Sequence, residues 1–278
     1  MSFPYLTDVL HAFGIDMRLP IPTFGLLVAS AFLIGNWVAG IEARRLLPRQ
    51  PRDFMNNVCL IGFIAGLAGA KLFHVLEHPR EFVEAPMRML LSTGGFTIFG
   101  GLIVGILAGA IYARRQKAEL PLVLDAVAPA LMLAYGIGRI GCQISGDGDW
   151  GIAATSPPPA GIPEWLWAQT YRGNIAGVEI PPPGVFPTPL YETLMAFAAF
   201  GLLWKLRKHA HSSGWLFGVY LLLAGIERLA IEPIRVNVTF SLFGAEVTQA
   251  QLIASACVLA GIFVMWRRRT RAAPAVGV

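Results

Sequence analysis

The sequence predicts an all-α polytopic membrane protein with about seven transmembrane helices, and three observations lead to this fold class. Of the 278 residues, 55% are hydrophobic and only 14% are charged. The mean hydropathy is +0.59. The apolar residues form long blocks that short basic runs separate. A single soluble core of this size does not bury so much apolar surface, so the composition excludes an ordinary water-soluble protein.

Seven apolar segments approach the length that a helix needs to cross a bilayer, which is roughly 20 residues for about 30 Å of hydrocarbon. These segments comprise residues 21–41, 55–76, 96–112, 122–140, 190–206, 215–231 and 247–266. We therefore interpret residues 1–278 as a single transmembrane bundle.

Basic residues give the orientation of this bundle. Most of the 22 lysines and arginines lie in four runs on one side of the predicted membrane, at residues 44–52, 114–117, 205–208 and 267–271. Because basic loops stay in the cytoplasm, the N-terminus is predicted outside and the C-terminus inside, which requires an odd number of spans. The same basic residues flank apolar segments and form no aromatic-interleaved face, so we expect no nucleic-acid partner.

Two segments are expected to lie outside the bilayer on the external side. Residues 1–20 have the character of an amphipathic arm at the membrane surface. Residues 142–188 form a long loop rich in proline and tryptophan, and tryptophan favours the boundary between water and lipid. We interpret this loop as a small external cap.

Ionisable side chains inside apolar segments are costly and are functional candidates by default. Most of them gather near the predicted outer ends of the spans: Lys71, His74, Arg139, Glu192, Glu227, Arg228, Glu232 and Arg235. Asp125 lies near an inner end. Arginines beside carboxylates at headgroup depth suit a phosphodiester, because guanidinium stays charged and donates in a planar fork. The alternative is that these residues are membrane anchors and structural salt bridges.

The sequence gives little indication of a metal or another cofactor, and we predict none. The three cysteines, Cys59, Cys142 and Cys257, have no CxxC spacing, so neither a zinc site nor a disulfide framework follows. His74, Glu77 and His78 form an H-x-x-E-H string, which keeps a metalloprotease as a distant alternative although no third ligand can be assigned.

Several motifs resemble the prolipoprotein diacylglyceryl transferase family. Residues 125–129 read DAVAP, residues 138–141 read GRIG and residues 146–151 read GDGDWG, in the order of the family's signature region. Three more segments extend the match: FGGL at 99–102 resembles HGGL, PTPLYE at 187–192 resembles HPxxLYE, and GIERLAIEPIR at 225–235 resembles RFxxExxR. The resemblance covers nearly the whole chain.

The resemblance implies a multi-pass enzyme of the bacterial inner (plasma) membrane that takes part in lipoprotein biosynthesis. Such an enzyme transfers a diacylglyceryl group from phosphatidylglycerol to the lipobox cysteine thiol of a prolipoprotein and releases glycerol phosphate. The expected partners are therefore phosphatidylglycerol, a prolipoprotein signal peptide or another thiol acceptor, and membrane lipids. Free cysteine is mostly protonated at neutral pH, so the reaction needs a group that accepts the thiol proton.

Site residues follow from the matched positions. The expected catalytic residues are Arg139, Arg228, Glu192 and His74. The residues expected to bind substrate are Arg139, Arg235, Asp125, Cys142, Asp147, Gly151, Tyr191 and Glu232.

The chain departs from the family at several polar positions. Phe99 and Phe186 stand where the family has histidine, and Cys142 follows GRIG where the family has asparagine. These changes remove the most obvious general base, and a positioned base commonly contributes about 10² to 10⁴ in rate. His74 or Glu192 could replace it. The alternative function is a catalytically impaired relative that binds anionic phospholipid or uses a different acceptor.

Overall fold

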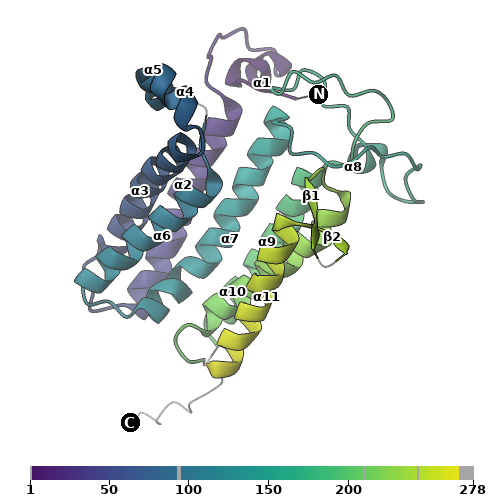
Figure 1. Ribbon diagram of the computed structural model, residues 1–278. Coiled ribbons are helices and arrows are strands. Elements are labelled where there is room, and N and C mark those ends of the chain that lie inside the picture. Colours follow the sequence, from purple (N-terminus) through teal and green to yellow (C-terminus); the bar gives the residue numbers. More distant parts are fainter. Residues whose placement is uncertain (1, 93–94, 210, 243, 269–278) are drawn as a thin grey trace. The chain divides into compact units, whose positions relative to one another are not determined.

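The computed structural model describes residues 2–92, 95–209, 211–242 and 244–268 and is mostly helical in these ranges (Figure 1). The long helices are α2 (Thr23–Leu46), α3 (Phe54–Glu77), α6 (Ile98–Arg115), α7 (Leu120–Ser145), α9 (Thr188–Leu206), α10 (Trp215–Ile231) and α11 (Gln249–Arg267). Shorter elements are α1 (Leu6–Ala12), α4 (Pro79–Glu84), α5 (Pro86–Leu91), α8 (Glu164–Trp167), the 3₁₀ turn η1 (Glu232–Ile234), and strands β1 (Thr239–Leu242) and β2 (Ala245–Thr248).

Five described helices are long and apolar enough to cross a membrane, namely α2, α3, α6, α7 and α11. Helices α9 and α10, of 19 and 17 residues, occupy the other two predicted spans. The all-α polytopic membrane class is therefore confirmed.

Most predicted boundaries differ from the structure by a few residues, and two of these differences concern segments next to the candidate site. The fourth apolar segment was expected to end at residue 140, but α7 continues to Ser145 and carries Cys142 in its last turns. The last segment was expected to begin at residue 247, but β1 and β2 form an antiparallel hairpin that ends at Thr248. Thr248 then caps α11 by accepting a hydrogen bond from the backbone N–H of Gln251 at 3.1 Å.

The chain divides into two compact units. One unit comprises residues 36–126, and its centre is the helix pair α3 and α6. Glycines bring these two helices together: a Cβ atom on Gly105 would lie 2.8 Å from the carbonyl oxygen of Gly62, and one on Gly66 would lie 3.3 Å from that of Gly101. Glycine therefore sets the spacing of this helix pair, since only small residues allow backbones to approach so closely.

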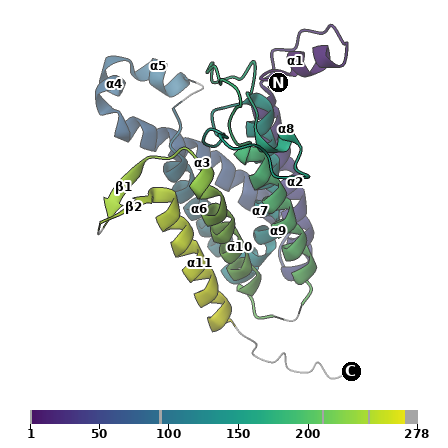
Figure 2. The same cartoon turned by 90° about the vertical axis from the view of Figure 1, so that its right-hand side faces the viewer.

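The other unit comprises residues 1–35 and 127–278. Its apolar core lies among α7, α9 and α10 and includes Met132, Ala196, Leu203 and Leu216. Helix α11 runs beside α10 (Figure 2). A Cβ atom on Gly225 would lie 2.6 Å from the carbonyl oxygen of Ala254, so glycine sets the spacing of this pair.

The segment between α7 and α9 is ordered by backbone pairing, although it contains only the short helix α8. Isolated bridges join Ala153 and Gln169 to Val185, and another joins Gly151 to Arg235. The N-terminal residues attach to this segment, since the N–H of Ser2 donates to the carbonyl of Arg172 at 2.8 Å. These contacts fix the segment beside the end of α7, where the candidate site lies.

Candidate functional site at an arginine–carboxylate cluster

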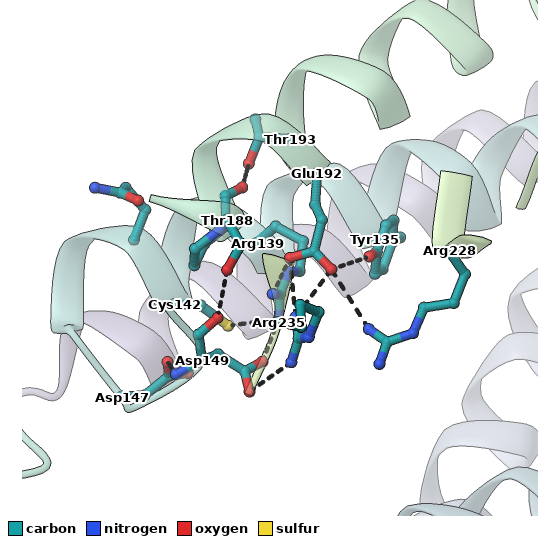
Figure 3. Close-up of polar contacts among 12 residues, drawn as sticks. Tyr135, Arg139, Cys142, Asp147, Asp149, Thr188, Glu192, Thr193, Arg228 and Arg235 are labelled. Atoms are coloured by element: carbon teal, nitrogen blue, oxygen red, sulfur yellow. Dashed lines mark hydrogen bonds and ion pairs between the residues drawn. The ribbon is translucent and has the colours of Figure 1, made fainter. Parts of the chain in front are cut away.

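Glu192 is the centre of a cluster of charged side chains in the unit formed by residues 1–35 and 127–278. Three arginines point toward its carboxylate (Figure 3). Arg139 donates to Oε2, Arg235 donates to both oxygens at 3.0 and 3.1 Å, and Nη1 of Arg228 lies 3.6 Å from Oε1. Glu192 has no exposed surface, and a buried carboxylate of this kind stays ionised because cations compensate for its lost hydration.

Chain folding brings these groups together from distant parts of the sequence. Arg139 is on α7, Glu192 is in the first turns of α9, Arg228 is near the end of α10, and Arg235 directly follows η1. Pro233 lies in that 3₁₀ turn, and proline cannot continue a helical hydrogen-bond ladder. The chain therefore leaves the α10 axis, and Arg235 reaches Glu192 from a non-helical segment.

Asp149 forms a second bridge between two of the arginines. Its carboxylate accepts from Nη1 of Arg139 and, at 3.0 Å, from Nη2 of Arg235. Burial alone would raise the pKa of Asp149, but hydrogen bonds and charge from Arg139 and Arg235 lower it below the usual value of 3.8. The Asp149 side chain is 42% exposed, so it is the cluster's carboxylate at the solvent boundary.

Two neighbours hold the backbone around Asp149. The hydroxyl of Thr188 donates to the Asp149 carbonyl at 2.8 Å. The N–H of Gly151 donates to the carbonyl of Phe186 at 2.8 Å, and a Cβ atom at Gly151 would meet the carbonyl oxygen of Ile234. Glycine is required there because the chain passes directly against the residue before Arg235.

Glu232 connects the cluster to α11. Its Oε2 lies 2.8 Å from Nη2 of Arg228, while its Oε1 accepts from Asn237 at 2.9 Å and from the hydroxyl of Thr248. Since Thr248 is also the N-cap of α11, Glu232 holds Arg228 against the start of that helix.

Tyr135 links a fourth carboxylate, that of Glu227, to the cluster. Its hydroxyl lies 3.2 Å from Oε1 of Glu192 and 3.2 Å from Oε1 of Glu227. Glu227 is only 7% exposed. The two carboxylates are thus joined through one phenolic oxygen.

Two buried donors of the cluster have no hydrogen-bond partner among the described residues: Nε of Arg139 and Nε of Arg235. An unsatisfied buried donor costs about 1–3 kcal/mol, and more for a charged group. Oxygen atoms of an anionic ligand would satisfy both donors. The arrangement can therefore bind a phosphate group, and guanidinium is the side chain that matches its geometry.

Cys142 lies at the edge of this cluster, buried, with its sulfur 3.5 Å from Nη1 of Arg139. Its sulfur and the carboxylates of Asp147 and Asp149 lie within 4.8 Å of one another, which is close enough to hold a metal ion. Arg139 already supplies a cation to this group. The positive charge of Arg139 would repel a metal ion bound to these three side chains, so the group suits the guanidinium alone.

Other residues predicted for the site lie elsewhere. The Tyr191 hydroxyl donates to the Leu166 carbonyl at 2.5 Å, so it contacts the segment between α7 and α9. Asp125 and His74 belong to the unit formed by residues 36–126, whereas the cluster belongs to the other unit. Asp125 is fully buried on α7, and the His74 ring packs 4.5 Å from the ring of His78.

The H-x-x-E-H string forms a compact group in that same unit. Donor atoms of His74, Glu77 and His78 lie within 4.8 Å of one another. Glu77 accepts a hydrogen bond from Thr97 at 2.7 Å, and Nδ1 of His78 lies 3.1 Å from the His74 carbonyl oxygen. These contacts orient two of the three side chains.

Sequence reasoning did not assign three residues of the cluster to the site: Tyr135, Asp149 and Glu227. Tyr135 precedes Arg139 by four residues on one helix, so the two share a face, and this spacing could have identified it. Asp149 lies two residues after Asp147, and only Asp147 was assigned to the site from the resemblance. Glu227 was noted only as an ionisable residue in an apolar segment.

Comparisons with known proteins show the family of this chain. A family model described as prolipoprotein diacylglyceryl transferase matches residues 11–267. Proteins named phosphatidylglycerol–prolipoprotein diacylglyceryl transferase are similar along most of the chain. The protein from Bacillus cereus (strain 03BB102) is 30% identical over 96% of this chain and 94% of its own length. The protein from Leptospira interrogans (serovar copenhageni) is 31% identical over 77% of this chain and 71% of its own.

A third protein of that name, from Bacillus cytotoxicus, is 29% identical over 90% of this chain and 89% of its own length. The matched region contains every residue of the arginine–carboxylate cluster. This chain is a membrane protein that belongs to the prolipoprotein diacylglyceryl transferase family.

Proposed function

We propose that this protein transfers the diacylglyceryl group of phosphatidylglycerol to the lipobox cysteine thiol of a prolipoprotein and releases glycerol phosphate. The observation that carries the proposal is the convergence of three guanidinium groups on one buried carboxylate, with two buried Nε donors free to receive phosphate oxygens. The names of the related proteins supply the two substrates.

In this reaction the thiol sulfur forms a bond to a glycerol methylene carbon, and the bond from that carbon to the phosphate oxygen breaks. The electron pair of the broken bond stays on the phosphate oxygen, and a base accepts the thiol proton. The departing glycerol phosphate therefore gains negative charge. Fixed cations stabilise such a transition state, because they are already oriented toward the position where charge develops.

We assign the phosphate-binding role to Arg139 and Arg235, whose Nε donors are unsatisfied, and to Arg228, whose side chain is 26% exposed. Glu192 positions all three. Glu192 can accept the thiol proton only after one of its ion pairs with an arginine is broken. We therefore keep both His74 and Glu192 as candidates for the base. The remaining proposed substrate-binding residues are Asp125, Cys142, Asp147, Gly151, Tyr191 and Glu232.

The proposed location is the bacterial inner membrane, with the N-terminus outside and the C-terminus inside. In that orientation the cluster, at the outer end of α7, is near the external headgroups. A secreted prolipoprotein presents its signal peptide at this surface. The arginines would therefore meet the phosphate of a lipid in the external leaflet.

A second candidate function is lipid binding without transfer. Two aromatic replacements favour it: the Phe186 ring packs edge-on against Trp167 with centroids 5.0 Å apart, and Phe99 is 41% exposed. Neither side chain can move a proton, whereas histidine at either position could. This candidate keeps the arginine site and lacks turnover.

One experiment separates the two functions. Purified protein in nanodiscs containing phosphatidylglycerol is incubated with a lipobox peptide, and glycerol phosphate release is followed together with peptide mass. The proposed transfer predicts a mass gain of one diacylglyceryl group, and a Cys-to-Ser peptide serves as the matched control. Retention of the lipid without any mass gain would reject transfer to this acceptor and favour the lipid-binding function.

A further inference from the structure

The hydroxyl of Tyr135 lies between two carboxylates, and this geometry limits how many protons they hold. Its oxygen is 3.2 Å from Oε1 of Glu192 and 3.2 Å from Oε1 of Glu227. A phenol has one proton to donate. If both glutamates were ionised, Tyr135 could donate to only one of them. The other contact would then bring two oxygen lone pairs together with no hydrogen atom between them. Both contacts become hydrogen bonds when one glutamate carries a proton.

The surrounding charges indicate which glutamate holds that proton at rest. Glu192 is fully buried and receives ion pairs from Arg139, Arg228 and Arg235, and these cations favour negative charge on Glu192 over negative charge on Glu227. Glu227 has no ion pair of this kind among the described residues. Its charged neighbours are Glu192 on α9, Arg139 on α7 and Arg228 on its own helix. The proton therefore belongs to Glu227, which donates to Tyr135, which in turn donates to Glu192.

The charge balance of the cluster ties this proton to anion binding. The cluster contains three arginines and four carboxylates, the latter being Asp149, Glu192, Glu227 and Glu232, and Asp147 adds a fifth carboxylate at its edge. With every carboxylate ionised the net charge is negative, which opposes an incoming phosphodiester. One proton on the Glu192–Glu227 pair makes the net charge less negative by one unit. Charges in a water-poor site interact strongly, so this single proton changes the affinity for an anion.

We propose that Glu227, Tyr135 and Glu192 form a proton-sharing relay, and that a phosphodiester binds to the arginines most tightly when the relay holds its proton. This proposal rests on the proposed function, because it takes the phosphate group of phosphatidylglycerol as the ligand. Tyr135 and Glu227 act through Glu192 and are positioning residues. When phosphate oxygens accept the guanidinium hydrogen bonds that Glu192 held, the relay can pass a proton to Glu192. Tyr135 donates its phenolic proton to Glu192 and accepts the carboxyl proton of Glu227, so one O–H bond breaks on Glu227 as one forms on Glu192.

Binding measurements across pH test the relay. The ligand is a short-chain phosphatidylglycerol added to protein in an uncharged detergent, and affinity is measured by calorimetry in buffers of different ionisation enthalpy. Because the bound state holds the proton more firmly, affinity should fall as pH rises. In the range where the relay titrates, linkage sets the limiting slope at about tenfold per pH unit. The buffer series should show proton uptake on binding.

Glu227→Gln provides the decisive comparison. Glutamine is neutral at every pH and can still donate to Tyr135, so the variant keeps the charge and the hydrogen bonds of the protonated relay at rest but has no proton to pass to Glu192. We expect its lipid affinity to be independent of pH and higher than that of wild type at alkaline pH, without proton uptake. A variant that was merely damaged would bind less tightly at all pH values. Glu246→Gln, at an exposed side chain of β2, is the matched control and should behave as wild type.

A second readout does not depend on lipid binding. A protonated carboxyl group has its own C=O stretch in the infrared spectrum. Wild type should show this band at neutral pH, Glu227→Gln should lack it, and Tyr135→Phe should shift it because the hydrogen bond is lost. Absence of the band, or an unchanged pH dependence in Glu227→Gln, would overturn the relay. If the lipid does not bind to wild type while the band is present, the proposed function fails and the proton sharing stands.

Discussion

At the scale of single residues, Glu192 determines whether three buried or half-buried arginines can stand together. Each guanidinium repels the others, and their common contact is this carboxylate, which water does not reach. Removing one partner of a buried ion pair is strongly destabilising, because the remaining charge loses its compensation. Glu192 therefore maintains the site as well as forming part of it.

Glu192→Gln is expected to lower the free energy of unfolding by an amount on the order of 3–5 kcal/mol, the cost of breaking a buried pair. Thermal unfolding in detergent would measure the loss. Glu246→Gln makes the same chemical change at an exposed side chain of β2 and should have no measurable effect. Equal stability of the two variants would show that the arginines do not need this carboxylate.

Asp149→Asn tests the second bridge through its pH dependence. In wild type the pKa of Asp149 is lowered by Arg139 and Arg235, so the carboxylate's stabilisation is fully present above its unfolded value of about 3.9. The stabilisation is lost as pH falls through the folded pKa. The variant should unfold at a lower temperature than wild type near neutral pH, and the difference should vanish in strong acid. A difference that persists unchanged in acid would contradict the pairing.

The sequence predicts that the arginines and Glu192 belong to the site, because ionisable side chains are rare in and next to apolar segments. Tyr135 was missed because a tyrosine in an apolar span looks like an ordinary packing residue. The contacts of Asp149 were missed for a different reason. The turn after α7 directs its carboxylate toward Arg139 and Arg235, and local sequence does not reveal which of two nearby aspartates is so directed. Loop conformation depends on tertiary contacts such as that between Thr188 and the Asp149 backbone.

At the scale of helices and strands, close packing of α10 against α11 determines where Arg228 lies. Gly225 precedes Arg228 by three residues, and a Cβ atom there would lie 2.6 Å from the backbone oxygen of Ala254. Backbone cannot move aside as a flexible side chain does, so the helices would have to separate. The ion pair between Arg228 and Glu232 would shift with them.

Gly225→Ala should therefore lower the free energy of unfolding by about 1–3 kcal/mol, as overpacking usually does. It should also reduce lipid affinity through Arg228. The control is Gly201→Ala on α9, where among the described residues no atom beyond the helix's own backbone lies within 4 Å of the added Cβ. That change should be neutral or stabilising by up to about 1 kcal/mol, because alanine favours helix more than glycine does. Similar losses in both variants would mean that helix spacing is not the cause.

Hydrophobic length predicted the helices well, but not the hairpin of β1 and β2. Residues 239–248 mix apolar and polar side chains and lie next to a longer apolar run. The hydropathy of that run predicts a membrane span and gives no separate signal for two short strands before it. The extension of α7 to Ser145 was missed because Gly141 suggests a helix end. In the structure, Gly141 lies within the helix and packs against Phe24, 3.2 Å from the position of an added Cβ.

At the scale of the whole molecule, the prediction that remains is orientation in the membrane. The basic runs predict that the N-terminus is outside and the C-terminus inside. Single cysteines at Glu179 and Gln116, both exposed, would test this in whole cells with a membrane-impermeant maleimide after removal of the native cysteines. Glu179→Cys should be labelled and Gln116→Cys should not. The opposite pattern would reverse the topology and place the arginine cluster on the cytoplasmic side.

The central claim is that the arginine cluster makes phosphatidylglycerol a donor of its diacylglyceryl group. The most direct measurement compares wild type, Arg139→Gln and Arg172→Gln in phosphatidylglycerol nanodiscs, with headgroup release and the mass of the lipobox peptide followed in one sample. Arg172 is an exposed arginine in the segment between α7 and α9. Removal of one charge-stabilising donor typically costs roughly 10² to 10³ in rate. We predict such a loss in Arg139→Gln, with Arg172→Gln and wild type both modifying the peptide. Equal turnover in all three proteins would contradict the claim.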